Sequence, residues 1–128
     1  MIVDTSAVVA IILEEPGHEI VLQKLLTARS RAIGTPTLLE ACLVLAPRMR
    51  PGAVQVLDGF IRRFRLTPIP FTEVHWRAAA EANLRFGKGR HPAALNFGDC
   101  LTYAVAKIAS MPLLFIGGDF SQTDLTAA

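Results

Sequence analysis

Four acidic residues stand beside apolar segments that would be expected in a protein core. Asp4 follows the strand-like IV at the start of the chain, Glu40 lies within TLLEACLVLA, and Asp99 lies within LNFGDCLTYAVA. Asp119 follows the apolar PLLFIGG. A buried carboxylate is costly unless a cation or strong hydrogen-bond donors meet it. We therefore ask whether these four residues meet a common positive partner.

A divalent metal ion is the partner that this residue type favours. If the acids converge, two carboxylates about 5 Å apart repel by roughly 3 kcal/mol at an effective dielectric constant near 20. Hard oxygen ligands without nitrogen or sulfur favour Mg²⁺, or else Mn²⁺, over zinc. Such an ion can activate a water and neutralise charge on a phosphate, which suits phosphodiester hydrolysis. The sequence has no Ser-His-Asp order and no GxxxxGK loop.

Each acid also has an ordinary structural explanation. Asp4 can cap the helix that follows it, and Asp99 can do the same. Asp119 and Asp124 can be turn residues, and Glu40 can be satisfied by an arginine or a backbone group. These roles explain the acids one at a time, whereas a metal site explains them together.

Short strands and longer helices alternate along the chain, with proline and glycine between them. Strands are predicted at 2–4, 31–34, 66–71 and 112–117, and helices at 5–15, 18–29, 37–46, 54–64, 73–86 and 96–110. The prolines in LTPIPF favour the edge of the sheet for the third strand. In the fourth helix, we expect Val54, Leu57, Ile61 and Phe64 to mark the buried face.

This alternation predicts an α/β fold with a parallel sheet and helices on both faces. In such sheets, ligands bind beyond the carboxyl ends of the strands. Asp4 and Asp119 follow the first and last strands, and Glu40 and Asp99 lie in the opening turns of helices. All four are therefore expected at one edge of the sheet.

Composition narrows the class of protein. Residues 1–128 suit a single domain, and 52% apolar residues exclude a disordered chain. The net charge of +2 does not by itself indicate nucleic-acid binding. Cys42 and Cys100 are expected to be buried thiols. No secretory signal or membrane span is apparent, so we expect a cytoplasmic protein that does not enter a membrane.

Four stretches occur in order over almost the entire chain: MIVDTSAVVAIILEEPG, TPTLLEACLVL, GKGRHPAALNFGDCLTYAVAK and LLFIGGDFSQTDL. Together they resemble the PIN-domain ribonucleases, in particular the VapC toxins of bacterial toxin–antitoxin pairs. The resemblance implies a PIN-like three-layer α/β/α sandwich with a central parallel sheet. It implies an Mg²⁺-dependent endoribonuclease that cuts structured RNA, such as tRNA or rRNA, and is neutralised by a VapB-type antitoxin. It also implies a cytoplasmic homodimer.

The resemblance further assigns roles to individual residues. Ser6 is implied as a supporting hydroxyl near the metal. The family often has Asn or Asp where this chain has Gly118, so Asp124 is a substitute or supporting acid. The implied catalytic and metal-binding set consists of Asp4, Glu40, Asp99 and Asp119.

The loop GKGRHP precedes Asp99 and carries the expected RNA contacts. Lys88, Arg90 and His91 would meet the RNA backbone, and the contribution of the two cations should fall with added salt. An ordinary solvated loop is the alternative explanation. Trp76 and His75 are expected to be packing and surface residues, respectively.

Three other functions remain open at this stage. A PIN-family nuclease in RNA maturation, or one acting on DNA, would use the same site. A receiver-like module would bind Mg²⁺ without catalysis, although such modules pair acids after the first strand and DTS supplies only Asp4. A non-catalytic scaffold would bind a partner through its apolar helices.

Overall fold

A four-stranded parallel sheet forms the middle layer of the protein, in a computed structural model that describes residues 1–128. The strand order is β3-β2-β1-β4, which puts the proline-containing β3 at an edge, as predicted. The strands are short, and their register places Ile2 opposite both Ala32 and Leu113, and Ala32 opposite Thr67. The strands are β1 (Ile2–Val3), β2 (Ala32–Gly34), β3 (Thr67–Ile69) and β4 (Leu113–Leu114).

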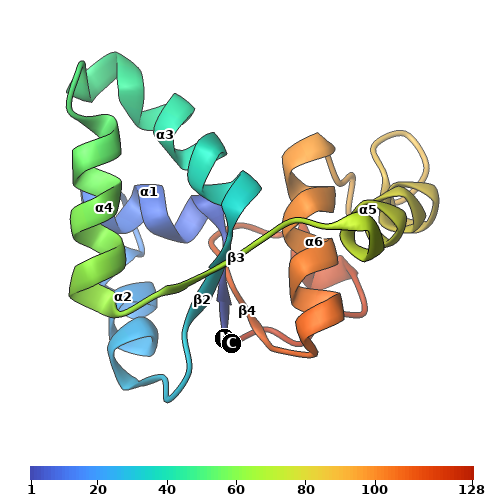
Figure 1. The fold of residues 1–128 in the computed structure, drawn as a ribbon. Helices are drawn as coiled ribbons and strands as arrows, with labels where there is room; N and C mark the ends of the chain where they lie inside the picture. The colour runs from blue at the N-terminus through green and yellow to red at the C-terminus, as the bar shows by residue number, and fades with distance from the viewer.

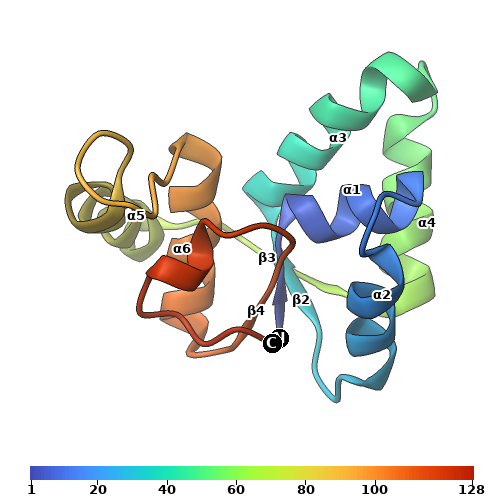
Figure 2. The same cartoon turned by 180° about the vertical axis from the view of Figure 1, so that it is seen from behind.

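Helices cover both faces of this sheet, which confirms the three-layer α/β/α prediction (Figure 1). Helices α1 to α4 pack on one face, and α5 and α6 pack on the other, as the reverse view in Figure 2 also shows. The helices are α1 (Thr5–Leu13), α2 (His18–Thr27), α3 (Thr35–Met49), α4 (Ala53–Phe64), α5 (Glu73–Phe86) and α6 (Phe97–Ala109).

Two separate cores result from the alternation of side chains along the strands. Ile2 and Leu113 face the core beneath α5 and α6, whereas Val3 and Leu114 face the core beneath α1 to α4. Adjacent strand residues point to opposite faces, and both faces of β1, β2 and β4 are covered, so these three strands are buried and contain no polar side chain, whereas the edge strand β3 is partly exposed. The acids that follow them are therefore carried by a rigid, buried frame.

The C-terminal segment returns to the sheet after a short 3₁₀ helix, η1 (Phe120–Gln122). The backbone of Leu113 donates to Thr126 and accepts from Ala128. The two chain ends consequently lie close together (Figure 1). This return positions the segment that contains Asp119 and Asp124.

Three expectations about side-chain burial need correction. The buried face of α4 is formed by Ala53, Leu57, Phe60 and Phe64, whereas Val54 is 55% exposed. On α5, His75 is buried and Trp76 is 51% exposed, the reverse of the expectation. His75 is buried because it completes the helix cap, with Nδ1 accepting from the Thr72 backbone.

Two other expectations concern the cysteines and the membrane. Cys100 is a buried free thiol, as expected, whereas Cys42 is a free thiol that is only half-buried. No helix has the length and apolar character that crossing a membrane requires.

Candidate active site

Asp4 is buried at the carboxyl end of β1, where it caps α1. Its backbone N–H donates to Leu114 O of the neighbouring strand at 2.9 Å. Its Oδ2 accepts from the Ser6 backbone N–H at 3.0 Å and from Ser6 Oγ at 2.6 Å. Ser6 Oγ in turn accepts from Ile116 N at 3.0 Å. Asp4 is thus held on two sides, and the capping role and the site position are compatible.

Asp99 occupies the first turn of α6, opposite the end of β1. Its Oδ2 accepts from the Asn96 backbone N–H at 3.0 Å, while its own N–H donates to Asn96 Oδ1 at 2.9 Å. This reciprocal capping box makes Asn96, rather than Asp99, the N-cap residue. The exchange starts α6 at a defined residue and directs Asp99 to the edge of the sheet.

Glu40 comes from the second turn of α3 and reaches the same place from another side. Its Oε1 accepts a hydrogen bond from Thr5 Oγ1. Its carboxylate also lies against Gly98: a Cβ at that position would overlap Oε2 and lie 2.8 Å from Cδ. Glu40 is therefore held between the starts of α1 and α6.

These three acids line one cleft of 320 Å³. Glu15 and Asn96 line it as well, and no Lys, Arg or His does. The pKa of Asp99 is raised to about 6, chiefly by burial and also by the charges of Asp4, Asp119 and Glu40, while the hydrogen bond from the Asn96 N–H acts to lower it. The cleft is thus a concentration of negative charge without a protein cation to offset it.

The donors in this cleft match a hard divalent cation, but their present spacing does not enclose one. All side-chain donors lining it are carboxylate, hydroxyl or amide groups, the types that suit Mg²⁺ and Mn²⁺. No three acidic, His or Cys side chains are placed to hold one ion together. Glu40, which is turned towards Thr5 and Gly98, has a longer side chain than Asp4 or Asp99 and can be redirected by rotation.

Asp119 lies beyond β4 and just before η1, outside the lining of the cleft. It is exposed, and its side chain makes no capping hydrogen bond to η1. Its negative charge nevertheless contributes to the raised pKa of Asp99. Asp119 is therefore an outer member of the acidic group, on a segment separate from the other three.

Asp124 belongs to a different cluster. Its carboxylate accepts from Tyr103 OH and Lys107 Nζ, each at 2.7 Å, and lies 3.5 Å from Arg85. Burial alone would raise the pKa of Asp124, but the hydrogen bonds from Lys107 and Tyr103 and the charges of Lys107 and Arg85 lower it to about 2. With its charge already compensated and its side chain outside the acidic cleft, Asp124 does not suit the role of substitute metal ligand.

The basic loop lies beside α6. Lys88 and Arg90 are exposed and make no salt bridge with an acid of the chain. His91 differs, because its Nδ1 accepts from the Ala93 N–H at 3.1 Å and its ring packs edge-on against Phe86, 5.1 Å between centroids. Lys88 and Arg90 are thus available for a ligand, while His91 shapes the loop.

Three residues of the site, Glu15, Asn96 and Gly98, are not predicted from the sequence. Glu15 follows the helix end set by Glu14, whose φ is +53°, and lies next to Pro16 in the sequence. Asn96 had a signal, because Asn three residues before an acid at a helix start is typical of a capping box. Gly98 had none, because its role depends on Glu40 from a distant helix.

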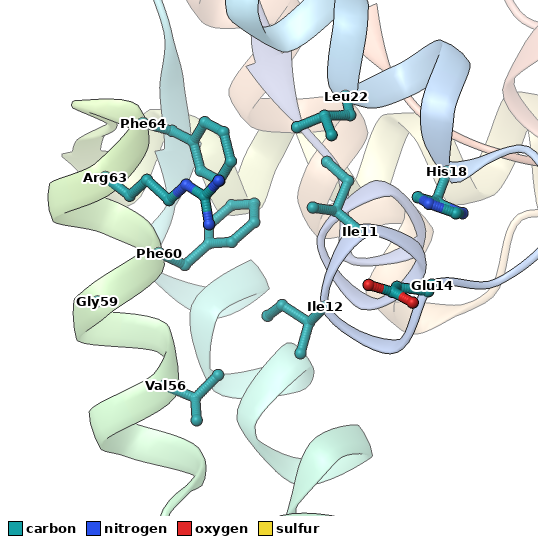
Figure 3. Close-up of a pocket in the computed structure, with 10 residues that line it drawn as sticks. All are labelled: Ile11, Ile12, Glu14, His18, Leu22, Val56, Gly59, Phe60, Arg63 and Phe64. Carbon is teal, nitrogen blue, oxygen red and sulfur yellow. The ribbon is translucent and has the colours of Figure 1, made fainter.

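A second hollow lies between α1, α2 and α4 (Figure 3). It encloses 420 Å³, and Phe60 and Phe64 of α4 face Ile11 and Ile12 of α1 across it. Its ionisable side chains are Glu14, His18 and Arg63. None of the acidic group lines it, so it has no part in the cleft chemistry.

Comparison with known proteins identifies the class of protein that this fold and acidic edge define. The family model described as PIN domain matches residues 1–125. The chain therefore belongs to the PIN domain family. This membership confirms the resemblance and does not support a receiver-like module.

Particular relatives are named ribonucleases. The chain is 47% identical over 126 residues to Ribonuclease VapC36 of Mycobacterium tuberculosis, covering 98% of this chain and 91% of that protein. It is 38% identical over 127 residues to Ribonuclease VapC of Mycolicibacterium smegmatis, covering 99% and 98%.

Solved structures share the fold at low sequence identity. VapC20 of Mycobacterium tuberculosis, described as a sarcin-ricin loop cleaving toxin, has a TM-score of 0.76 at 18% identity, with 99% of this chain and 97% of that chain covered. VapBC2 from Rickettsia felis, bound to a DNA fragment from its promoter, also has a TM-score of 0.76 at 18% identity, with 99% and 96% covered.

Proposed function

We propose that this protein is a VapC-type endoribonuclease toxin that hydrolyses phosphodiester bonds in structured RNA with the help of Mg²⁺ or Mn²⁺. The observation that carries the metal-dependent chemistry is the cleft in which Asp4, Glu40 and Asp99 meet without a protein cation. The ribonuclease activity is supported by relatives: the chain is 47% and 38% identical to two named VapC ribonucleases over nearly its full length.

The metal would be held by Asp4 and Asp99, with Glu40 and Asp119 as further acidic ligands. When bound, a divalent ion would activate a water and neutralise charge on the phosphate. Asp4 is already oriented to bind a metal, because Ser6 holds its carboxylate and Leu114 holds its backbone N–H. Asp99 binds a cation only in its deprotonated form, and a cation in the cleft would favour that form.

Glu40 and Asp119 would complete the set after their side chains turn towards Asp4 and Asp99. Rotation of the Glu40 side chain away from Thr5 would bring its carboxylate towards the other acids. Asp119 already contributes to the field at Asp99 from its exposed position. Ser6 would act by holding Asp4, not by touching the ion.

The RNA would lie along the acidic edge and be met by Lys88 and Arg90 on the neighbouring loop. Unpaired loops are the favoured targets, because their bases can be splayed open for reading. We further propose a VapB-type antitoxin as the neutralising partner, a homodimer as the assembled form, and the cytoplasm, where such RNA is found, as the place of action.

Cleavage of total cellular RNA by the purified protein tests the nuclease. We expect cleavage with Mg²⁺ that is abolished by EDTA and reduced at least 100-fold in Asp4→Asn and in Asp99→Asn. Asp58→Asn, on the surface of α4, is the matched control that should cleave normally. Cleavage that survives either site substitution would contradict the assignment of the acids.

A thermal-shift titration tests metal binding separately from cleavage. Mg²⁺ or Mn²⁺ should raise the melting temperature of the wild type by binding the folded state, and should do so less in Asp4→Asn. No shift up to millimolar metal would argue against a metal site in this cleft.

The toxin and the RNA-maturation nuclease share this chemistry and differ in what controls it. Expression of the toxin alone should arrest growth, and coexpression of a neighbouring small gene should relieve the arrest. Cleavage in vitro without any growth arrest would favour the maturation enzyme.

A further inference from the structure

An apolar groove opens beside the acidic cleft, between α5 and α6. It encloses 540 Å³ and is lined mainly by apolar side chains, among them Trp76, Phe97 and Leu101. Asn96 lines both this groove and the acidic cleft. The two hollows therefore adjoin at the residue that caps α6.

Two aromatic rings at this groove are exposed. Phe97 is 81% exposed although it is the first residue of α6, and Trp76 is 51% exposed on α5. Single exposed apolar side chains are normal, but a group around one hollow indicates a contact surface. The guanidinium of Arg77 lies over the Trp76 ring, 4.7 Å from its centroid.

The polar groups at the groove suit a nucleotide. Lys88 is the only charged residue that lines it, whereas the adjoining cleft is lined by four carboxylates. A ligand that occupies both the groove and the cleft would place a negative group at Lys88 and a flat apolar surface against Phe97 and Trp76. Asn96 Oδ1 accepts from Asp99 N, which leaves the Asn96 amide group free to donate to a base edge.

We propose that this groove binds an unpaired base of the RNA next to the cleaved phosphodiester, stacked on Phe97 and Trp76, with Lys88 at a flanking phosphate. The proposal rests on the proposed function, because it takes the substrate to be RNA. Stacking on an aromatic side chain tolerates every base. Phe97 would thus set the position of the strand rather than its sequence.

Trp76 provides a direct readout, because it is the only tryptophan in the chain. The experiment uses the Asp4→Asn protein, so that RNA is bound without being cut, and titrates a single-stranded oligoribonucleotide of about eight nucleotides. We expect the RNA to quench Trp76 fluorescence. A blunt RNA duplex of the same sequence should not.

Substitutions at Phe97 test the stacking. Phe97→Leu should weaken single-strand binding roughly five- to 150-fold, while Phe97→Tyr should keep it. Leu84→Ala is the matched control, because Leu84 is 63% exposed on α5 but does not line the groove. Equal affinity for Phe97→Leu and its parent, or no change in Trp76 fluorescence at saturation, would overturn the proposal.

Mass measurement by light scattering separates RNA binding from self-association. If Phe97→Leu lowers the oligomeric state and leaves RNA affinity unchanged, the groove is a contact between copies of the chain and the proposal is wrong. Failure of the proposed nuclease function has a different result: the wild type would not cleave RNA with Mg²⁺, although RNA would still quench Trp76 fluorescence. If Phe97→Leu cleaves RNA normally and RNA does not quench Trp76, the groove does not bind the base, while the proposed nuclease activity stands.

Discussion

The Glu40 carboxylate lies directly against the backbone of Gly98, the residue before Asp99, so that two acids from different helices are neighbours only because position 98 has no side chain. The space that a Cβ would need there is taken by the far end of a flexible side chain. A substitution at Gly98 should therefore move Glu40 and leave the fold in place.

Gly98→Ala should reduce RNA cleavage about 10- to 100-fold, because a displacement on the order of 1 Å at a catalytic group has this effect. The free energy of unfolding should change by less than about 1 kcal/mol. Urea unfolding and single-turnover cleavage measure the two effects. Gly59→Ala is the control, since a Cβ there has no neighbour within 4 Å. Loss of stability that matches the loss of activity would contradict this separation.

Ser6→Ala should destabilise the protein by about 1 kcal/mol and lower cleavage. The hydroxyl donates to Asp4 Oδ2 and accepts from Ile116 N, so its removal leaves both without that partner. Thr27→Ala removes an exposed hydroxyl bonded within α2 and should have a smaller effect. Equal losses of stability in the two variants would show that Ser6 does not tie β1 to β4.

The raised pKa of Asp99 predicts a pH-dependent penalty in the metal-free protein. Its pKa of about 6 in the folded state lies above the ordinary value of 3.8, so the folded protein binds this proton more tightly than the unfolded chain does. Stability should therefore fall as pH rises from about 4 to 6 and remain lower above that range.

Asp99→Asn removes this penalty. In EDTA at pH 7 it should be more stable than the wild type, by on the order of 1 kcal/mol, and the difference should shrink near pH 4.5. Urea unfolding at the two pH values measures it. At subsaturating Mg²⁺, cleavage by the wild type should decline below about pH 6, because the proton then competes with the cation for Asp99. A less stable Asp99→Asn protein at pH 7 would contradict the sign of the effect.

Asp124→Ala should lower stability by about 1 kcal/mol, a value that allows for the partial exposure of the ion pairs. It removes the acceptor of Tyr103 OH and Lys107 Nζ. The depressed pKa of Asp124 means that its contribution is present above about pH 4 and is lost as pH falls towards 2. Mg²⁺ should raise the melting temperature of Asp124→Ala as much as that of the wild type. If Mg²⁺ does not raise it in the variant, Asp124 takes part in metal binding.

Lys88→Gln should weaken RNA binding. It should also reduce the slope of log affinity against log salt concentration by about 1, since one phosphate contact is lost. Arg29→Gln is the control, because Arg29 is exposed just before β2, at the opposite edge of the sheet from the acids. Binding isotherms between 50 and 200 mM salt, near the range in which phosphate contacts weaken, measure the slope. If the dependence of affinity on salt has the same slope in both variants, Lys88 does not contact the RNA.

Much of the frame can be predicted from the sequence because its causes are local. Apolar runs of two or three residues, the proline of β3 and the capping groups at Asp4 and Asn96 act over a few neighbouring residues. Parallel topology then places the residues that follow each strand at one edge. The grouping of Asp4, Glu40 and Asp99 follows from these features alone.

Only the tertiary structure separates acids that look alike in the sequence. Asp119 and Asp124 are five residues apart in the same tail, yet one adds to the field at Asp99 and the other binds Tyr103 and Lys107. Likewise, the contact of Glu40 with Gly98 and the exposure of Phe97 depend on how α3, α5 and α6 pack. Local preferences act along the chain, whereas the charge balance of a carboxylate is set by groups that the packing of distant elements brings near.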